Sequence, residues 1–293
     1  MRQKTKLSAL LTCHNRCPLT LACLASLYQQ RLPDDVELGV FLVDDGSSDG
    51  TAEAVQQQFP RVNVIQGDGS LFWNRGMHKA FAAAIEHDSD FYVWLNDDCR
   101  LYPDTIAVLL RTYDELNKLT GSCAHIIGSA MQDPTTGEFS YGGVKKYATT
   151  LGRIKQIRIA PKPDKAQECQ AVNGNCVLIS REVVARIGNL DPVFTHRWGD
   201  HDYCFRALDA GCQVWLAPGY RGTCKANPVA GTWEDVRLPI GKRLRALRSQ
   251  RGYAPQDYKI YLQRHRGRWW WLNYLAPYIK IAVSQVTGRL RPQ

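Results

Sequence analysis

Short apolar runs alternate with amphipathic stretches over the first two thirds of the chain. Runs rich in β-branched and aromatic residues, each followed by polar residues, predict buried strands at 6–12, 37–43, 62–65 and 91–95. Helical spacing of the apolar residues predicts helices that open at Pro18, near Thr51 and near Met77. This alternation is typical of an α/β protein with a doubly wound, mainly parallel sheet.

Acidic residues follow two of the predicted strands. Asp44 and Asp45 end the second strand, and Asp97 and Asp98 follow the fourth. Ligands of doubly wound sheets bind beyond the carboxyl ends of the strands, so we expect all four carboxylates at one edge of the sheet. Adjacent carboxylates repel each other, whereas a hard divalent cation needs oxygen ligands of this kind. A second interpretation stays open, because Asp, Gly and Ser also form turns and helix caps.

The middle of the chain predicts the antiparallel part of a mixed sheet. Within residues 119–170 the segments AHIIGSAM, GEFSYGGV and LGRIKQIRIA alternate as strands do. A polar Asn-Gly-Asn turn at 173–175 then precedes the apolar run CVLIS.

The segment FTHRWGDHDYCFR, residues 194–206, crowds two His, two Asp, two Arg and a Trp, and a helix is predicted to begin near Asp200. An acid there suits a helix N-terminus, and Asp202 and Arg206 have the spacing of an ion pair on a helix surface. The two histidines lack partners at metal-ligand spacing, so we expect surface or supporting roles for them.

The basic character of the chain lies in its C-terminal part. Residues 237–293 contain thirteen Lys or Arg and one acid, a net charge of +12 against +9 for the whole chain. We therefore expect a catalytic domain over 1–236 and a basic, aromatic extension over 237–293. The 15-residue apolar run Trp269–Val283 is interrupted by Asn273, Pro277 and Lys280, and it is too short to span a bilayer. It has the composition of a helix in the lipid headgroup region, although a helix packed on the catalytic domain also fits.

Several classes are excluded by what the sequence lacks. No GxGxxG opens the first helix and no GxxxxGK[ST] occurs, which argues against a dinucleotide dehydrogenase and a P-loop ATPase. The ten cysteines show no CxxC pair and no Cys/His zinc spacing, so we expect them to be reduced and largely buried. The first apolar run is short and continues into CHNR, unlike a signal peptide, and a cytoplasmic protein is expected.

Six motifs carry a resemblance to a known family. LLTCHNR, VDDGSSDGT, GDGSLFWNRGMHKAF, VWLNDDCRLYPD, NGNCVLISREVVARIGNLD and WGDHDYCFRALDAG occur in the order and spacing of family 2 glycosyltransferases. The chain resembles this family over roughly Leu7–Pro218, and within it is most similar to bacterial enzymes that add rhamnose or a similar sugar to surface polysaccharides. The resemblance implies inverting chemistry and the GT-A fold, a Rossmann-like mixed, mainly parallel sheet flanked by helices, here with a C-terminal helical extension.

The resemblance also implies roles for individual residues. GDHD matches the motif with the catalytic base, which indicates Asp200, and NDD matches the motif that holds a divalent cation, Mg²⁺ or Mn²⁺, through Asp98. Asn96 stands where this motif usually begins with Asp, and an amide oxygen is a weaker ligand than a carboxylate. The nucleotide contacts implied are Thr12, Asn15, Asp44, Asp45, Trp73, Asn74 and Asp97. The acceptor contacts implied are Asn173, Gly174, Trp198, His201 and Asp202.

The expected activity is transfer of a sugar from a UDP- or dTDP-linked donor to a glycan or lipid-linked acceptor in cell-surface polysaccharide synthesis. The basic extension predicts contact with an anionic membrane, at the inner face of the cytoplasmic membrane, and no nucleic acid is expected. Two alternative functions explain less of the sequence. A sugar-phosphate nucleotidyltransferase would need a Gly-rich basic loop after the first strand, which CHNRCPLT is not. A nucleic-acid-binding protein would leave the four carboxylates without a purpose.

Overall fold

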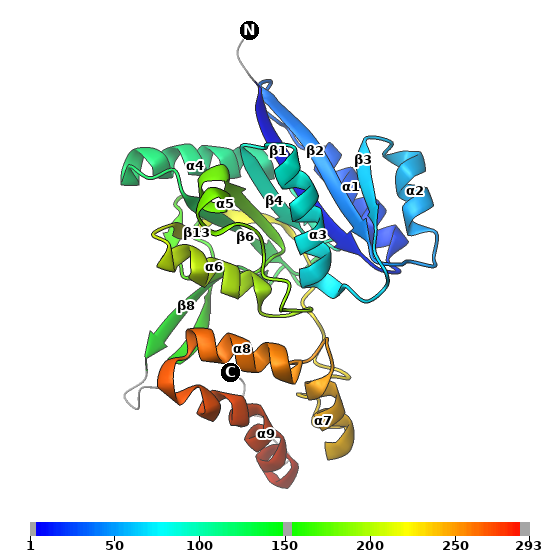
Figure 1. The fold of residues 1–293 in the computed structure, drawn as a ribbon, viewed down its shortest axis with the longest axis vertical. Helices are drawn as coiled ribbons and strands as arrows, with labels where there is room; N and C mark the ends of the chain where they lie inside the picture. The colour runs from blue at the N-terminus through cyan, green and yellow to red at the C-terminus, as the bar shows by residue number, and fades with distance from the viewer. Residues whose placement is uncertain (1–3, 149–153, 288–293) are drawn as a thin grey trace.

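The computed structural model describes residues 4–148 and 154–287, and a ten-stranded mixed sheet lies at its centre (Figure 1). The strands of this sheet are β1 (Thr5–Cys13), β2 (Val36–Asp44), β3 (Val62–Gln66), β4 (Phe91–Leu95), β5 (Arg100–Leu101), β6 (His125–Gln132), β7 (Phe139–Tyr141), β10 (Gln167–Glu168), β12 (Cys176–Ser180) and β13 (Gln213–Thr223). The strand order is β10-β13-β6-β12-β4-β1-β2-β3, with β5 paired to β13 and β7 to β6. A smaller sheet contains β8 (Gly143–Ala148), β9 (Ile154–Ile159) and β11 (Ala171–Val172).

Helices cover both faces of the large sheet. They are α1 (Cys17–Tyr28), α2 (Thr51–Gln58), α3 (Phe72–Glu86), α4 (Thr105–Thr120), α5 (Arg181–Ile187) and α6 (Gly199–Asp209). Phe81 of α3 and Tyr203 of α6 belong to one buried cluster, and Leu24 of α1 and Leu109 of α4 belong to another. The alternating side chains of the strands supply both clusters, since successive residues of a strand point to opposite faces.

The observed strands agree closely with those predicted. β1, β2, β3 and β4 form the parallel part, in which β1 pairs with β2 and β4 and β2 pairs with β3. β12 is antiparallel to both β4 and β6, so the prediction of a mixed, mainly parallel sheet is confirmed. The segment predicted to be antiparallel, residues 119–170, is only partly antiparallel, because its strand β6 also pairs in parallel with β13. Residues 151–153 of the segment LGRIKQIRIA lie outside the described residues.

Helix α3 begins five residues before its predicted start. Its first N–H groups have partners from elsewhere in the chain: the Phe72 N–H donates to Asp45 Oδ2 at 2.9 Å, and the Asn74 N–H donates to the Thr195 carbonyl at 3.0 Å. These partners satisfy donors that the helix itself leaves unpaired, and apolar periodicity does not reveal them.

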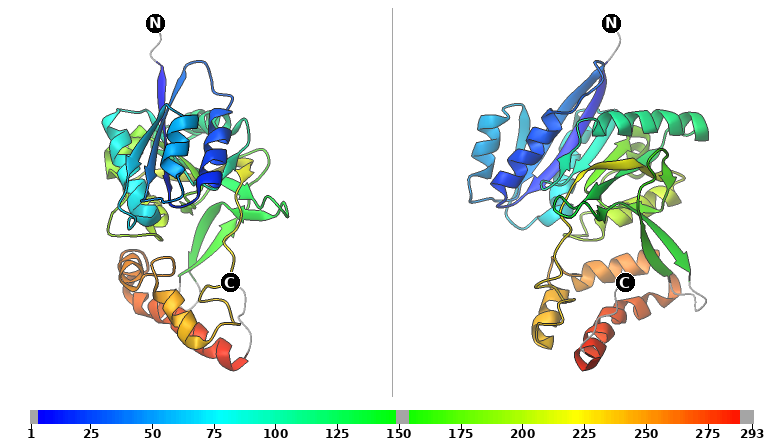
Figure 2. Two further views of the ribbon diagram at one scale, coloured as in Figure 1. Left: turned by 90° about the vertical axis from the view of Figure 1, so that its right-hand side faces the viewer. Right: turned by 180° about the vertical axis from the view of Figure 1, so that it is seen from behind.

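Three further helices follow the sheet at one end of the molecule: α7 (Ile240–Arg248), α8 (Pro255–His265) and α9 (Trp270–Thr287), with a 3₁₀ turn at Gly267–Trp269 (Figures 1 and 2). Tyr258, Tyr261 and Leu262 of α8 belong to the same buried cluster as α3 and α6. α7 and α9 share a separate small core with Trp233. α8 therefore packs on the catalytic part, and Trp270 and Tyr274 of α9 are partly buried against the same cluster. Membrane contact by the Trp269–Val283 run and the division at residue 236 stay predictions.

The fold bears on two expectations, the state of the cysteines and the presence of membrane-spanning helices. All ten cysteines are free and eight of them are buried, as predicted. Among the described helices, none combines the length and the hydropathy needed to cross a membrane.

Candidate active site

The carboxyl ends of β1, β2 and β4 meet at one edge of the sheet, where the four predicted carboxylates gather. Cys13 at the end of β1 pairs in register with Asp44 at the end of β2. Burial raises the pKa of the Cys13 thiol, and the charges of Asp44 and Asp97 raise it further. Asp44 at the end of β2 and Asp97 after β4 thus both act on the Cys13 thiol, because β1 lies between these two strands.

The Asp44–Asp45 pair holds the turns around it. Asp44 Oδ1 accepts a hydrogen bond from the Ser47 N–H at 3.0 Å. Asp45 Oδ1 accepts from the Gly69 N–H, and its Oδ2 from the Phe72 N–H, both at 2.9 Å. Both carboxylates are almost completely buried. The turn interpretation is therefore confirmed for this pair, and nucleotide contacts from it stay a prediction.

Thr12 and Asn15 frame the same edge. Thr12 is buried against α3, where a Cβ on Gly76 would lie only 2.2 Å from the Thr12 hydroxyl oxygen. Asn15 has a positive φ of 51°, its N–H donates to Ser47 Oγ at 2.9 Å, and its Oδ1 accepts from the Ser48 N–H at 2.7 Å. Asn is among the residues that tolerate this backbone conformation. Asn15 thus ties the loop after β1 to the loop after β2.

Asp97 and Asp98 form ion pairs with the same side chain, Arg16, which was not predicted from the sequence. One guanidinium nitrogen of Arg16 donates to Asp97 Oδ1 at 2.9 Å and to Asp98 Oδ2 at 3.2 Å. Burial raises the pKa of Asp97 to about 6, with Arg16 lowering it and Asp98 raising it. Asp97 Oδ2 is buried and has no hydrogen-bond partner in the described part of the chain. The site therefore contains an unsatisfied anionic oxygen, which is unusual without a ligand.

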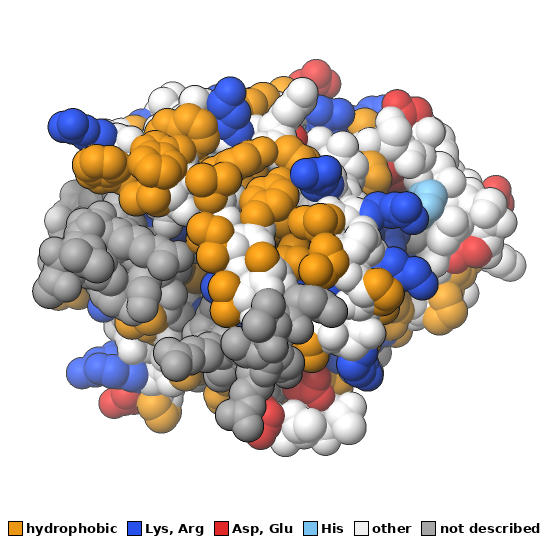
Figure 3. Space-filling view, turned by 90° about the horizontal axis from the view of Figure 1, so that it is seen from below, with side chains coloured by type: hydrophobic (Ala, Val, Ile, Leu, Met, Phe, Trp, Pro, Cys, Tyr) orange, Lys and Arg blue, Asp and Glu red, His pale blue; other side chains and the backbone are white. Residues whose placement is uncertain are grey.

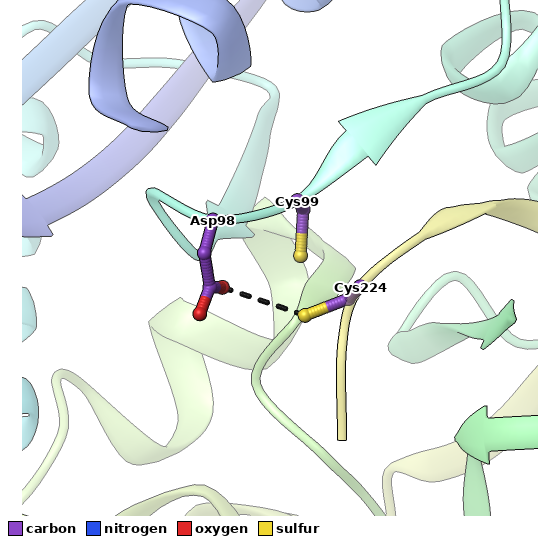
Figure 4. Close-up of side chains that lie close together, drawn as sticks. All are labelled: Asp98, Cys99 and Cys224. Atoms are coloured by element: carbon purple, nitrogen blue, oxygen red, sulfur yellow. Dashed lines mark hydrogen bonds between the residues drawn. The ribbon is translucent and has the colours of Figure 1, made fainter. Parts of the chain in front are cut away.

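Asp98 is turned toward two cysteines (Figure 4). Cys224, just after β13, donates its S–H to Asp98 Oδ1 at 3.4 Å. The carboxylate oxygen of Asp98 and the sulfurs of Cys99 and Cys224 all lie within 4.8 Å of one another. The buried Asn175 amide donates to the Cys224 sulfur at 3.2 Å. Cys224 and Asn175 were missed, because only the fold brings residues so distant in sequence together.

Trp73 links the acidic run to the second half of the site. Its indole N–H donates to Asn96 Oδ1 at 2.7 Å, so the amide oxygen that replaces the usual Asp is already engaged. Its ring lies so close to Gly174 that a Cβ there would come within 2.3 Å of it. Gly174 is therefore required for this packing, and its position is more specific than a turn alone would demand.

Asp200, the predicted base, lies in the first turn of α6 and is half-buried. Its Oδ2 accepts the Gly174 N–H at 3.2 Å, and its Oδ1 accepts the His201 N–H at 2.8 Å. Asn173 Oδ1 lies 3.5 Å from the Gly142 N–H, at the limit of a hydrogen bond. Burial lowers the pKa of His201, which keeps its imidazole neutral near Asp200. A continuous set of contacts thus runs from Asn96 through Trp73 and Gly174 to the proposed base.

Three predicted site residues have structural partners instead. Asn74 is fully buried, and its amide donates to the carbonyls of Asp191 and Phe194, both at 2.8 Å. This arrangement holds the loop before α6, and it leaves the Asn74 side chain no free donor for a nucleotide.

Asp202 is also fully buried, so its predicted ion pair with Arg206 does not lie on the helix surface, and an acceptor contact from Asp202 stays a prediction. The pair with Arg206 at 2.9 Å exists, but Asp202 also binds Arg264 at 3.2 Å and His265 at 2.8 Å on α8. Trp198 stacks on Tyr258 and Tyr261 at 4.9 and 4.8 Å between ring centroids. Both side chains therefore fasten α8 to α6, the helix that carries Asp200. The sequence did not reveal these contacts, because apolar spacing within α6 does not show which residues of α8 pack against it.

Comparison with known proteins agrees with this geometry. Residues 8–188 match the family described as glycosyl transferase family 2. No curated protein matches the chain. Among solved structures, S. aureus TarS 1–349 in complex with UDP-GlcNAc is 13% identical with a TM-score of 0.60, and 98% of this chain and 93% of that chain are covered.

Two further structures show the same fold. A mannosyltransferase from Pyrobaculum calidifontis in complex with GDP-Man and Mn²⁺ is 17% identical with a TM-score of 0.52, covering 99% of this chain and 77% of that one. GalNAc-T7 with UDP, GalNAc and Mn²⁺ is 13% identical with a TM-score of 0.58, covering 97% of this chain and 55% of that one. The family match spans more than half of the chain, and the chain therefore belongs to glycosyl transferase family 2 and is a glycosyltransferase with the GT-A fold.

Proposed function

We propose that this enzyme transfers a sugar, with inversion, from a UDP- or dTDP-linked donor to a glycan or lipid-linked acceptor during synthesis of a cell-surface polysaccharide. The observation that carries the proposal is the connected edge that holds Asp97 and Asp98 at one end and Asp200 at the other. A nucleotide-sugar donor is supported by the UDP-GlcNAc and GDP-Man in complex with two structural neighbours. A rhamnose-like donor remains the finer proposal that the sequence motifs suggest.

The residues present fit a divalent cation. Asp97 Oδ2 is a buried oxygen without a partner, and Asp98 Oδ1 is bonded only by a weak thiol donor among the described side chains. Asp98, with Asp97, would hold the cation, which when bound screens the charge that develops on the leaving diphosphate. Mn²⁺ in two structural neighbours supports a divalent cation here, whether Mg²⁺ or Mn²⁺.

Asp200 would act as the general base. Its carboxylate removes the proton of the acceptor hydroxyl as that oxygen attacks the anomeric carbon opposite the diphosphate, which inverts the configuration. The Gly174 and His201 N–H groups orient the carboxylate. Asn173 and Gly174, beside the base, would face the acceptor. Asp44, Asp45, Thr12, Asn15 and Trp73 surround the proposed nucleotide position.

Nucleotide binding should depend on the cation and on Asp98. We expect UDP or dTDP to raise the melting temperature more with Mn²⁺ than in EDTA, since a ligand at about 100 times its Kd stabilises the native state by about 2.7 kcal/mol. Asp98→Asn should remove most of the cation-dependent gain. Asn96→Ala should remove less, because Asn96 Oδ1 is engaged by Trp73. A thermal-shift series on the three proteins tests this, and equal stabilisation in EDTA would remove the cation from the mechanism.

Cation binding should also weaken in acid. The pKa of Asp97 in the folded protein, about 6, is above the ordinary value of 3.8. The contribution of this group to stability is therefore complete below pH 3.8 and lost as the pH rises through about 6. A cation must displace that proton below this pH, so the Asp97 proton alone should raise the Kd for Mn²⁺ about three- to fourfold between pH 7.5 and pH 5.5. Titration calorimetry on wild type and Asp97→Asn checks this, and an equal pH effect in both would exclude Asp97.

The basic extension is the proposed contact with an anionic membrane surface. One face of α9 packs inward through Ile281, and the opposite face exposes Trp271, Leu272, Leu275 and Ile279 at helical spacing. Figure 3 shows this end of the molecule, where apolar side chains gather among Lys and Arg. The exposed basic residues of the neighbouring α7 are Lys242, Arg245 and Arg248. An apolar stripe beside cationic side chains suits a bilayer interface, whereas two copies of this face would repel each other.

Acidic substitutions on this face should release the protein from membranes. Leu275→Glu with Ile279→Glu should weaken binding to vesicles with anionic lipid by about tenfold or more, because it removes apolar insertion and adds repulsion. The melting temperature should change little, since both side chains are exposed. Leu119→Glu, an exposed site on α4, is the matched control in co-sedimentation. A change in oligomeric state, or stronger binding to RNA or DNA than to vesicles, would instead favour another partner for this face.

A further inference from the structure

Two cysteine sulfurs lie beside the proposed metal ligand and have no role in the mechanism above. Cys99 follows Asp98 directly, and Cys224 comes from the far end of β13, so they converge through the fold (Figure 4). Both are buried, at 0% and 2% exposure. Buried cysteines usually serve as small apolar side chains, but these two sulfurs and Asp98 lie within 4.8 Å of one another.

The geometry points to a divalent cation bound jointly by the Asp98 carboxylate and the thiolates of Cys224 and Cys99. Tetrahedral zinc ligands at their usual bond lengths lie about 3.5 Å apart. The distance from Asp98 Oδ1 to the Cys224 sulfur is 3.4 Å. Three protein ligands leave one position open, as in catalytic zinc sites, and a diphosphate oxygen could take it.

Surrounding groups favour this role. In the absence of metal, the Cys224 S–H proton lies between the sulfur and Asp98 Oδ1, the position that a cation would replace. Arg16 binds the other Asp98 oxygen, Oδ2, and leaves Oδ1 available. The Asn175 amide donates toward the Cys224 sulfur at 3.2 Å and the Cys99 sulfur at 3.9 Å. N–H donors of this kind surround metal thiolates in proteins.

The coordination step is balanced without any redox partner. The cation binds one carboxylate and two thiols, each thiol releases one proton to solvent, and no electrons are exchanged. Thiolate ligands shift preference from Mg²⁺ and Mn²⁺ toward softer cations such as Zn²⁺ and Co²⁺. The inference rests on the proposed function insofar as Asp98 is the metal ligand, and it changes the chemical class of the metal.

Cobalt(II) absorption tests the sulfur ligands directly. Titrating the full-length protein with Co²⁺, with and without UDP, should give a thiolate-to-cobalt charge-transfer band in the near ultraviolet. Cys224→Ser should abolish most of this band, and Cys99→Ser should reduce it by about half. Cys212→Ser is the matched control, because Cys212 is similarly buried and directly precedes the strand that Cys224 follows. Zn²⁺ should displace Co²⁺ and bind at least about tenfold more tightly than Mn²⁺.

The outcomes separate this inference from the proposed function. If the wild-type protein binds Co²⁺ without the charge-transfer band, the cysteines are not metal ligands. Mn²⁺-dependent stabilisation by UDP would in that case still support a divalent cation in the proposed function. Absence of both the band and any cation effect on UDP binding would overturn both. Melting temperatures of the metal-free variants show whether loss of the band reflects misfolding, and the wild-type spectrum decides the matter even if a variant fails to fold.

Discussion

Asp200→Asn should lower turnover by about 10²- to 10⁴-fold while donor binding and folding are retained. The amide cannot take the acceptor's proton at neutral pH, but it keeps the size of the side chain and one oxygen for the Gly174 or His201 N–H. Loss of one weak backbone contact should cost about 1 kcal/mol or less. The measurement is turnover, Kd for UDP and melting temperature on the same preparations.

Asp209→Asn is the control for this experiment, since Asp209 is an exposed acid on the same helix. It should leave turnover within about twofold of wild type, because an exposed substitution away from the site costs little. If Asp200→Asn remains as active as Asp209→Asn, the carboxylate only caps α6 and the base must be sought elsewhere. A loss of UDP binding alongside turnover would instead place Asp200 on the donor side.

The positions of the acids at the strand ends could be predicted because they depend on local pattern and on a general rule of parallel sheets. A strand pattern that ends in Asp44 or Asp97 fixes the end of the sheet at which the carboxylate lies. Their partners could not be predicted in this way. Arg16 reaches Asp97 from a loop 81 positions earlier, and Cys224 reaches Asp98 from 126 positions later. Such pairs depend on strand order and loop path, which periodicity does not encode.

The C-terminal extension shows a different limit of sequence reasoning. Its composition fits either packing on the catalytic part or contact with a membrane. In the structure, α8 packs on the catalytic part, and α9 exposes apolar side chains. Tyr258 and Tyr261 of α8 stack on Trp198, while Trp271 and Ile279 of α9 are exposed. An apolar helix can present two apolar faces, so composition alone cannot choose between a buried and an exposed role.

Asp202→Ala should destabilise the protein by about 3 kcal/mol, because it removes a fully buried carboxylate from Arg206, Arg264 and His265. This is at the low end for a broken buried ion pair, since Arg264 keeps 37% of its side chain exposed and stays partly hydrated. The expected fall in melting temperature is about 6 °C or more. Asp209→Ala, on the exposed part of the same helix, should leave the melting temperature nearly unchanged.

The same substitution should alter the acid stability of the fold. Burial alone would raise the pKa of Asp202, but hydrogen bonds from His265 and Arg206 hold it below its ordinary value of 3.8. Its contribution to stability is therefore present above pH 3.8 and is lost as the pH falls through the lower folded-state value. The difference in unfolding free energy between wild type and Asp202→Ala should accordingly be largest near neutral pH and shrink in acid. A constant difference at every pH would mean that Asp202 acts through packing and not through its charge. A loss of turnover with unchanged stability would favour the predicted acceptor contact of Asp202, because a residue that only joins α6 to α8 must affect folding first.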